Sequence, residues 1–473
     1  MIPGDGCWRI ERADRARLIV DADDYFAAVR AAMMTAKKRI MLIGWDFDAR
    51  IRIGDGRDGA PARVGDFILW LVKRNPELDV YLLRWDFGAV KAMFRGATPF
   101  ILLRWWRHDR IHVQLDAMHP PGASHHQKIV VIDDEMAFCG GIDMTEGRWD
   151  TRAHRDNDPR RMGPNGKPTM PWHDATMALS GPVATALGEL ARERWRCATE
   201  QELAPAHGEG DPWPRDLVPD FENVDVAISR TRPDHAELTP VHEIESLYLS
   251  FIARARRFIY AENQYFASRR IGEAIAKRMA EPDPPEIVLV GPEQADGWLE
   301  QVAMDNARAL LWEAIGKCDA RQRFRIYHPF TAAGDSVYVH AKIMIVDDEV
   351  LRVGSSNWNN RSLRLDTECD VTIDDPALGE KIAAIRCGLM AEHLNCPAER
   401  VANVFAETGS LIDTIARLQG PGRSLRAYEP PELNEVEQAL AENQALDPEN
   451  PDELFEPFSS GKLLRRFPGL RRR

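Results

Sequence analysis

The sequence contains one pattern twice, as His126-Gln127-Lys128-Ile129-Val130-Val131-Ile132-Asp133 and as His340-Ala341-Lys342-Ile343-Met344-Ile345-Val346-Asp347. In each copy a His-x-Lys triplet precedes four apolar residues and an aspartate. Apolar runs rich in β-branched residues are typical of strands buried on both faces. Because side chains two positions apart on a strand lie on the same face, the His and Lys of each copy can reach one chemical group together.

Both copies are also followed by the same features: an Asp-Asp-Glu turn, a short apolar return strand, and a Gly-small-x-polar motif. That motif is Gly140-Gly141-Ile142-Asp143 in the first copy and Gly354-Ser355-Ser356-Asn357 in the second. A single His-x-Lys triplet would carry little information, but two copies with identical internal spacing are hard to attribute to chance. We therefore predict two half-sites that build one active site.

The duplication extends upstream of each motif. Each half is expected to begin with an amphipathic helix, followed by an apolar strand that ends in polar residues and by two further strands. These elements are expected at 23–38, 39–45, 78–83 and 111–115 in the first half, and at 241–256, 257–264, 286–290 and 324–327 in the second. The pattern predicts an α/β protein made of two duplicated α-β-α sandwich halves, with a shared active site at their interface.

The expected domains are a first half at 1–203, a linker at 204–224, a second half at 225–400 and a C-terminal region at 401–473. The linker is rich in Pro, Gly and acidic residues. The C-terminal region is expected to be helical and acidic and to end in a basic tail, with part of it disordered. The basic tail could bind anionic lipid, and an equally good interpretation is a solvated surface segment.

Bulk composition argues against several classes of protein. The formal net charge of −13 argues against long-range attraction to nucleic acid. The seven cysteines have no paired spacing, which favours reduced thiols over disulfides or a cysteine zinc site. Residues 1–20 lack the apolar core of a signal peptide, and no apolar run is long enough to span a bilayer. We expect a cytoplasmic protein that would meet a lipid substrate peripherally, at the membrane surface.

The paired motif suits phosphodiester chemistry. Cleavage needs a nucleophile, a proton donor for the leaving oxygen, and positive charge on the phosphate oxygens. His126 and His340 can divide the first two roles because imidazole titrates near neutrality. Lys128 and Lys342 supply the charge, and Asn357 can donate a hydrogen bond to the phosphate.

A catalytic histidine also needs an acceptor that fixes its tautomer. Glu368, which follows the second motif, is the best candidate, and Asp150, Asp156 and Asp158 remain open candidates in the first half. Asp143 cannot donate when ionised and can instead hold a lysine.

The motif aspartates Asp133 and Asp347 belong to the candidate catalytic set. Their position at strand-ending turns nevertheless favours capping of backbone N–H groups. The neighbouring His125 and His126 point to opposite faces of the chain, so we expect neither a metal nor a cofactor and predict that activity survives EDTA.

The motif resembles that of the phospholipase D superfamily, over roughly residues 20–395. The segments 140–150, 171–174, 262–266 and 354–368 are similar to phosphatidylcholine-cleaving phospholipases D of eukaryotic type. The resemblance implies hydrolysis of a glycerophospholipid through a phosphohistidine, with His126 as nucleophile and His340 as general acid. Water or an alcohol would be the acceptor, so head-group exchange is also implied. The sequence alone does not fix the order of the two histidines.

Two other activities of the same superfamily remain open. A cardiolipin synthase-like phosphatidyltransferase would use a lipid hydroxyl in place of water. A nuclease is disfavoured by the net charge and by the apolar, Trp-containing stretch 98–107. We expect that stretch to be a helix packed on the sheet rather than an interfacial element. The oligomeric state is not indicated by the sequence.

Overall fold

The computed structural model describes residues 1–86, 98–208, 210–236, 238–295, 298–431 and 447. The basic tail expected at the end of the chain lies outside these residues. Among the described helices, none combines the length and apolarity that crossing a bilayer requires. All seven cysteines are free, as their spacing predicted.

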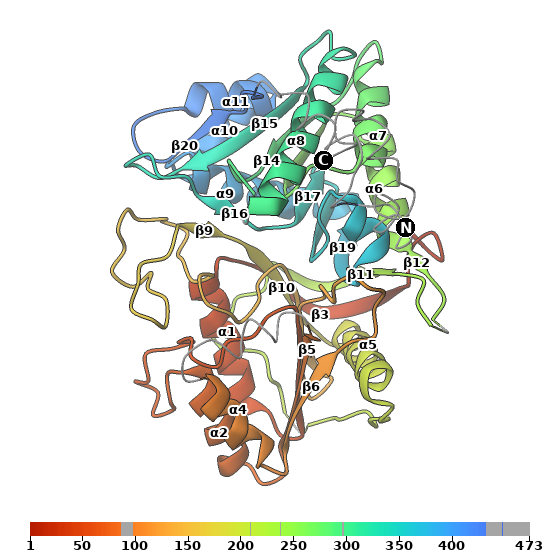
Figure 1. Ribbon diagram of the computed structural model, residues 1–473. Coiled ribbons are helices and arrows are strands. Elements are labelled where there is room, and N and C mark those ends of the chain that lie inside the picture. The colour runs from red at the N-terminus through yellow and green to blue at the C-terminus, as the bar shows by residue number, and fades with distance from the viewer. Residues whose placement is uncertain (87–97, 209, 237, 296–297, 432–446, 448–473) are drawn as a thin grey trace, which may run out of the picture.

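One sheet of 16 strands runs through the described part of the molecule (Figure 1). Two 12-residue strands, β3 (Arg9–Val20) and β11 (Phe221–Arg232), lie antiparallel at its centre. On the β3 side follow β10 (Ala175–Ser180), β8 (Met136–Gly140), β7 (Ile129–Ile132), β4 (Arg39–Gly44), β5 (Asp79–Trp85) and β6 (Ile111–Asp116). On the β11 side follow β19 (Glu368–Asp374), β18 (Val350–Gly354), β17 (Ile343–Val346), β13 (Phe258–Glu262), β14 (Glu286–Val290), β15 (Phe324–Phe330) and β20 (Ser424–Ala427), while the short β12 (Val241–His242) pairs with β11.

The strand order is the same on both sides of the β3–β11 pair, which confirms the duplicated α/β fold. In each half the first three strands after the amphipathic helix are parallel neighbours, and the motif strand pairs antiparallel with the first of them. The sequence did not predict that the halves share a continuous sheet. Its central strand β11 begins at Phe221, inside the segment 204–224 that reads as a linker.

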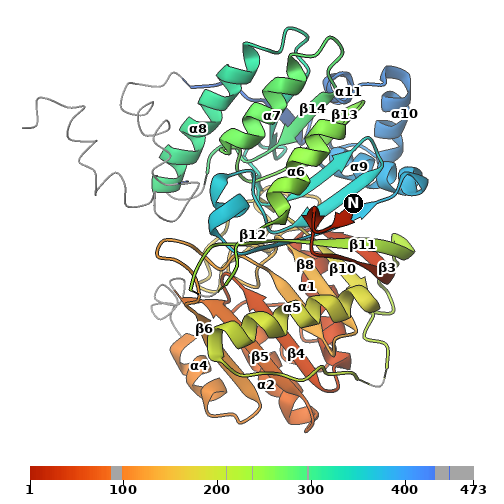
Figure 2. The ribbon, with the colours of Figure 1, turned by 90° about the vertical axis from the view of Figure 1, so that its right-hand side faces the viewer.

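Helices cover both faces of the sheet in each half (Figure 2). In the first half α1 (Ala22–Thr35) and α2 (Val64–Arg74) pack on one set of strand side chains, and α5 (Pro182–Thr199) packs on the alternate set. In the second half α6 (Glu243–Arg254) and α7 (Arg269–Met279) cover one face, and α9 (Gly379–His393), α10 (Ala398–Thr408) and α11 (Leu411–Leu418) cover the other. The helix α8 (Trp298–Gly316) packs beside α7.

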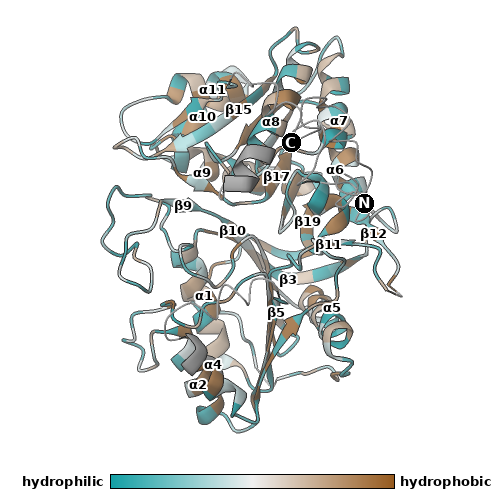
Figure 3. Ribbon diagram, in the orientation of Figure 1, coloured by the Kyte–Doolittle hydropathy of each residue, from teal (hydrophilic) through white to brown (hydrophobic). Residues whose placement is uncertain are grey.

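A single apolar core connects the two halves. It includes residues of α5 from the first half and of α9 to α11 from the second, so the halves are packed together as well as joined through the sheet. Apolar residues concentrate on central strands such as β17, whereas polar residues dominate the long loops (Figure 3). Burial of this continuous apolar surface stabilises the relative position of the two motif strands.

The Trp-containing stretch forms helix α4 (Thr98–Trp106), as the sequence predicted. Trp105 is fully buried and its indole N–H donates to the carbonyl of Gly65 at 3.0 Å. Trp106 is 80% exposed. The helix therefore packs on the domain through one tryptophan and presents the next to solvent.

Candidate active site at the junction of the two halves

The His-x-Lys triplets lie immediately before the motif strands, at the edge where the halves meet. Strand β7 begins directly after Lys128 and β17 directly after Lys342. The backbone N–H of His126 donates to the carbonyl of Thr367 in the second half at 3.0 Å. The backbone N–H of His340 donates to the carbonyl of His173 in the first half at 2.7 Å. Each triplet is thus held by the opposite half.

Each of the two histidines is oriented by a carboxylate of the opposite half. Nδ1 of His126 lies 3.0 Å from both carboxylate oxygens of Glu368, which begins β19. The hydroxyls of Ser355 and Ser362 donate to the same carboxylate at 2.5 and 2.6 Å. Glu368 therefore serves the first-half histidine, and both of its oxygens have several donors.

His340 has an equivalent partner that the sequence reasoning missed. Its Nδ1 lies 2.7 Å from Oδ2 of Asp174, the residue immediately before β10. The positions correspond: Gly140 pairs with Thr176 in β10, Gly354 pairs with Asp370 in β19, and each carboxylate lies two residues before the paired residue. Aligning the residues that follow the two motifs could have found Asp174, which lies within the segment 171–174.

The three aspartates left open for this role have other contacts, and that prediction is corrected. Asp150 accepts from His154 and Arg161, Asp158 accepts from Arg160, and Asp156 accepts from the backbone N–H of Ala333. Their proximity in sequence to the first motif was misleading because the partner of His340 comes after the intervening loop.

Asp133 and Asp347 cap backbone N–H groups, as their position at strand-ending turns favoured, and their place in the candidate catalytic set is corrected accordingly. Asp133 accepts hydrogen bonds at 2.7, 2.8 and 2.7 Å from three consecutive backbone N–H groups at the start of β4. Asp347 accepts at 2.7, 2.8 and 2.9 Å from the three corresponding groups at the start of β13. At about 3.3 Å per residue, a strand of this length places each aspartate roughly 20 Å from the histidine of its motif. Both anchor neighbouring strands.

The two lysines have unequal surroundings. Nζ of Lys128 lies 3.2 Å from the carboxylate of Asp143, which matches the interpretation that this aspartate holds a lysine. Nζ of Lys342 instead donates to the neutral amide oxygen of Gln264 at 3.0 Å. Asn357 donates to the same oxygen at 3.4 Å. Burial of Lys342, offset only in part by Asp174, lowers its pKa to about 7.

Burial and mutual repulsion set the protonation of the site. Burial is the largest cause that lowers the pKa of His126 and of His340 below the usual range, and both lysines lower each pKa further. Burial also raises the pKa of Glu368 and of Asp174 to about 7. The lysine of each half thus lowers the pKa of the other half's histidine as well as that of its own.

Aromatic rings lie beside both histidines. Trp45 is edge-on to His126, with ring centroids 6.5 Å apart. Trp172 lies 5.3 Å from His340, and the guanidinium of Arg148 lies 4.0 Å from the Trp172 ring centroid. Such apolar walls exclude water and strengthen electrostatic interactions with a bound anion.

His125 is excluded from the reacting set. Its Nδ1 lies 2.6 Å from the hydroxyl of Thr367, and its side chain is fully buried. Burial lowers the pKa of His125 to about 3, so its ring is neutral. Through Thr367 of the second half, His125 contributes to the connection between the halves.

Comparisons with known proteins agree with this geometry. Residues 107–209 match the family model described as phospholipase D, and residues 248–385 match the model described as cardiolipin synthase, PLD-like domain. Phospholipase D A of Dictyostelium discoideum is 25% identical over 436 residues, covering 73% of this chain and 32% of that protein. Phospholipase D alpha 1 of Carica papaya is 26% identical over 509 residues, covering 77% of this chain and 63% of that protein.

A solved structure has the same fold over nearly the whole length. The phosphatidylserine synthase of Haemophilus influenzae Rd KW20 aligns with a TM-score of 0.57 at 13% identity, covering 96% of this chain and 95% of that one. This chain spans between about one third and two thirds of the length of the curated relatives named above. With both family models, the curated phospholipases D and the duplicated fold in agreement, the chain belongs to the phospholipase D superfamily.

Proposed function

We propose that the protein hydrolyses the terminal phosphodiester of a glycerophospholipid to phosphatidic acid and a free head group. One observation carries the proposal: two imidazoles each use Nδ1 to contact a carboxylate of the opposite half, at 3.0 Å for His126 and 2.7 Å for His340. Both Nε2 atoms are then available to the substrate. One can attack phosphorus while the other donates a proton.

In the proposed first step, Nε2 of His126 attacks phosphorus. The bond from phosphorus to the head-group oxygen breaks, and Nε2 of His340 gives its proton to that oxygen. The products are a phosphatidyl group bonded to His126 and a free head-group alcohol. Glu368 stabilises the positive charge that develops on the His126 ring, and Lys128 and Lys342 stabilise the charge on the phosphate oxygens.

In the second step, neutral His340 accepts a proton from water as the water oxygen attacks phosphorus. The bond between phosphorus and Nε2 of His126 breaks, which releases phosphatidic acid and restores both histidines. An alcohol in place of water would give head-group exchange. In the first step His340 gives a proton to an oxygen that leaves phosphorus. In the second step it takes a proton from an oxygen that attacks phosphorus. The second step resembles the reverse of the first, so microscopic reversibility assigns the base role to the same residue.

Substrate binding itself can protonate His340, the proposed general acid. In the free protein, burial and then the charges of Lys342, Arg148 and Lys128 disfavour a proton on His340 and lower its pKa. A phosphodiester anion placed between Lys128 and Lys342 offsets their charge, so the pKa of His340 rises when the substrate is bound. The general acid would thus acquire its proton when it is needed.

Access to such a substrate would be peripheral. Trp106 is 80% exposed at the end of α4, and exposed tryptophan favours the boundary between water and lipid. We propose membrane contact there.

Activity on vesicles tests the proposal. Vesicles of phosphatidylcholine should yield choline and phosphatidic acid in equal amounts, and added ethanol should divert part of the product to phosphatidylethanol. His126→Asn should abolish both products, whereas Glu286→Gln, a buried carboxylate at the start of β14 outside the site, should retain them. Absence of phosphatidic acid from phosphatidylcholine, phosphatidylethanolamine and phosphatidylglycerol would refute the proposed activity.

A phosphatidyltransferase is the second candidate, favoured by the match of residues 248–385 to the cardiolipin synthase model. With phosphatidylglycerol as the only substrate, a transferase would form cardiolipin and glycerol, whereas a hydrolase would form phosphatidic acid and glycerol. A nuclease is disfavoured by the net charge of −13, and incubation with plasmid DNA tests it directly.

A further inference from the structure

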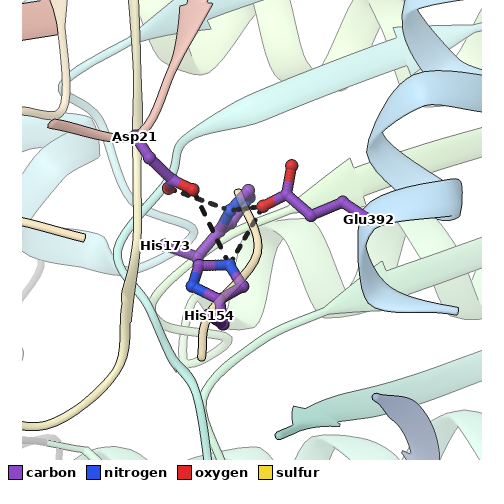
Figure 4. Close-up of side chains that lie close together, drawn as sticks. All are labelled: Asp21, His154, His173 and Glu392. Atoms are coloured by element: carbon purple, nitrogen blue, oxygen red, sulfur yellow. Dashed lines mark hydrogen bonds and ion pairs between the residues drawn. The ribbon is translucent and has the colours of Figure 1, made fainter. Parts of the chain in front are cut away.

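A second group of ionisable side chains lies buried beside the phosphate site. Asp21, His154, His173 and Glu392 converge on one point, with four ligand atoms within 4.8 Å of one another (Figure 4). Asp21 immediately precedes α1, His173 belongs to the short strand β9 (Trp172–His173), and Glu392 belongs to α9. All four are buried, the most exposed of them at 5%. The chemistry proposed for the phosphate does not use them.

The spacing of the donor atoms is that of a tetrahedral metal site. Glu392 Oε1 lies 3.0 Å from Nε2 of His154 and 2.9 Å from Nδ1 of His173. The Asp21 carboxylate lies 3.7 Å from the same His154 nitrogen and 3.3 Å from the same His173 nitrogen. Tetrahedral Zn²⁺ with bonds of about 2.0–2.1 Å separates its ligand atoms by about 3.3 Å. The four distances bracket that value.

The other nitrogen of each histidine has a carboxylate partner. Nδ1 of His154 lies 3.0 Å from Asp150, and Nε2 of His173 lies 2.6 Å from Glu262. Histidines that bind metals almost always use their second nitrogen in this way, which fixes the tautomer and orients the ring. Arg152 donates to the second oxygen of Glu392 at 2.6 Å. The outer contacts are those that a metal site requires.

One oxygen in the cluster has no hydrogen-bond partner. Oδ2 of Asp21 is buried and accepts no hydrogen bond from the described residues, with Nε2 of His154 3.7 Å away, while its Oδ1 accepts from the backbone N–H of Asp174 at 3.1 Å. A buried carboxylate oxygen that accepts no hydrogen bond is costly unless a cation lies close enough to satisfy it. Asp21 and His154 also have φ values of 66° and 39°, and such strained non-glycine backbone concentrates at functional sites.

The charge of the cluster leaves room for a divalent cation. Four carboxylates, Asp21, Asp150, Glu262 and Glu392, contact its two histidines. Two guanidinium groups, from Arg152 and Arg161, contact these carboxylates. With neutral imidazoles the excess is two negative charges in a buried place, which is unfavourable without compensation. A divalent cation would neutralise it, and so would a second proton on each of the two imidazoles.

We propose that Asp21, His154, His173 and Glu392 bind one Zn²⁺ ion as a structural clamp between the two halves. Two imidazoles favour Zn²⁺ over the hard cations Ca²⁺ and Mg²⁺, which prefer oxygen ligands. Four protein ligands close the coordination sphere, as in structural zinc sites, and leave no position for a substrate. This inference departs from the sequence-based expectation that the chain binds no metal. It concerns a site separate from the phosphate.

The clamp would act on the proposed general acid through a single residue. The carbonyl of His173 accepts from the backbone N–H of His340, and the next residue, Asp174, orients the His340 ring. Glu392 enters from α9 of the second half. A metal bound here would therefore fix the position of the Asp174–His340 pair and the contact of α9 with the first half.

Metal content tests the inference. Protein produced without a histidine tag in zinc-supplemented medium, and dialysed against a weak chelator, should retain about one zinc per chain. X-ray absorption at the zinc edge should show two nitrogen and two oxygen neighbours and no sulfur. Glu392→Gln should lose at least tenfold in zinc occupancy, whereas Glu286→Gln should keep it.

The wild-type measurements decide the question even if Glu392→Gln fails to fold. Zinc well below one tenth of an equivalent in folded wild-type protein would overturn the inference and assign the charge balance to two imidazolium ions. A sulfur neighbour or a six-oxygen shell would also overturn it, because it would place the metal elsewhere.

Discussion

Replacing Glu368 by glutamine should separate the two histidines by function. The carboxylate holds Nδ1 of His126 with two oxygens at 3.0 Å and leaves Nε2 to attack. In Glu368→Gln the amide N–H can donate to Nδ1. The proton of the ring then moves to Nε2, and the nucleophile carries a hydrogen where it needs a lone pair.

The size of the effect follows from the geometry. Two opposite unit charges 3 Å apart at an effective dielectric constant of 20 interact by about 5.5 kcal/mol. This is the upper limit of the loss of stabilisation for the charged ring, and at 1.36 kcal/mol per factor of ten it corresponds to about 10⁴ in rate. We expect kcat to fall by about 10³ to 10⁴ with little change in KM, because the carboxylate acts in the transition state.

Asp174→Asn makes the matching change at His340 and should give a different kinetic signature. On a natural lipid both variants should be slow. With a short-chain phosphatidyl-p-nitrophenol, nitrophenolate takes the place of the head group and departs without a proton, so the first step no longer needs the acid. Asp174→Asn should then release a burst of nitrophenol that approaches one per site and stall at the second step. Glu368→Gln should show no burst.

The opposite pattern, with a burst in Glu368→Gln alone, would exchange the roles of the histidines. Equal loss of the burst in both variants would refute the division of labour. Glu286→Gln is the matched control: Glu286 is also buried and accepts from a hydroxyl, that of Ser410 at 2.6 Å, but it lies outside the site. Its burst and turnover should be close to those of the wild type.

Three further predictions follow from the same contacts. Asp347→Ala should lower the free energy of unfolding by about 2–4 kcal/mol in urea titrations, because three backbone N–H groups lose a charged acceptor, while kcat per folded molecule is retained; loss of kcat at unchanged stability would make the aspartate catalytic. Because the pKa of Lys342 is lowered to about 7, its charge in the free enzyme is lost as pH rises above 7, and kcat/KM should decline on the alkaline side of the pH profile. Gln264→Glu places a carboxylate beside Nζ and should shift this alkaline decline upward by roughly 1 to 3 pH units. A decline that does not shift would exclude Lys342 as its origin. Finally, EDTA present only during an assay with a soluble substrate should leave kcat unchanged, since the phosphate step uses imidazoles and lysines, and a loss restored by a divalent ion would contradict this mechanism.

Much of the fold could be read from local sequence patterns. The motif strands, their hairpin partners and the upstream strands are apolar runs bounded by turn residues, and β7, β8, β17 and β18 lie where those patterns predicted. The central strand β3 was missed because its first residues alternate in charge, with Arg9, Glu11 and Arg12 near one end. Pairing of β3 with β11 joins segments about two hundred residues apart, and nothing local in the sequence specifies it.

Only part of the site could be predicted, because only part of it lies in a local sequence pattern. The histidines and lysines belong to two motifs with identical spacing, and this repetition identifies them from the sequence alone. Their carboxylate partners come from the opposite halves, and Asp174 contacts His340 from 166 positions away. The sequence suggested Asp150, Asp156 and Asp158 because they are near the first motif in the chain. In the fold, each histidine instead contacts a carboxylate that comes from the opposite half.

The two histidines occupy matching positions but have different environments. His126 faces a carboxylate that accepts from two serine hydroxyls, and His340 faces one whose other oxygen accepts from a backbone N–H. Lys128 is paired with a carboxylate and Lys342 with an amide. These differences between the halves are consistent with one histidine attacking and the other transferring protons.

The most direct test of the proposed mechanism is mass spectrometry of protein quenched during turnover of a short-chain phosphatidylcholine. The mechanism predicts a phosphatidyl adduct on His126 that forms in the wild type, accumulates in Asp174→Asn and is absent in His126→Asn. An adduct confined to His340, or turnover without any histidine adduct, would contradict it.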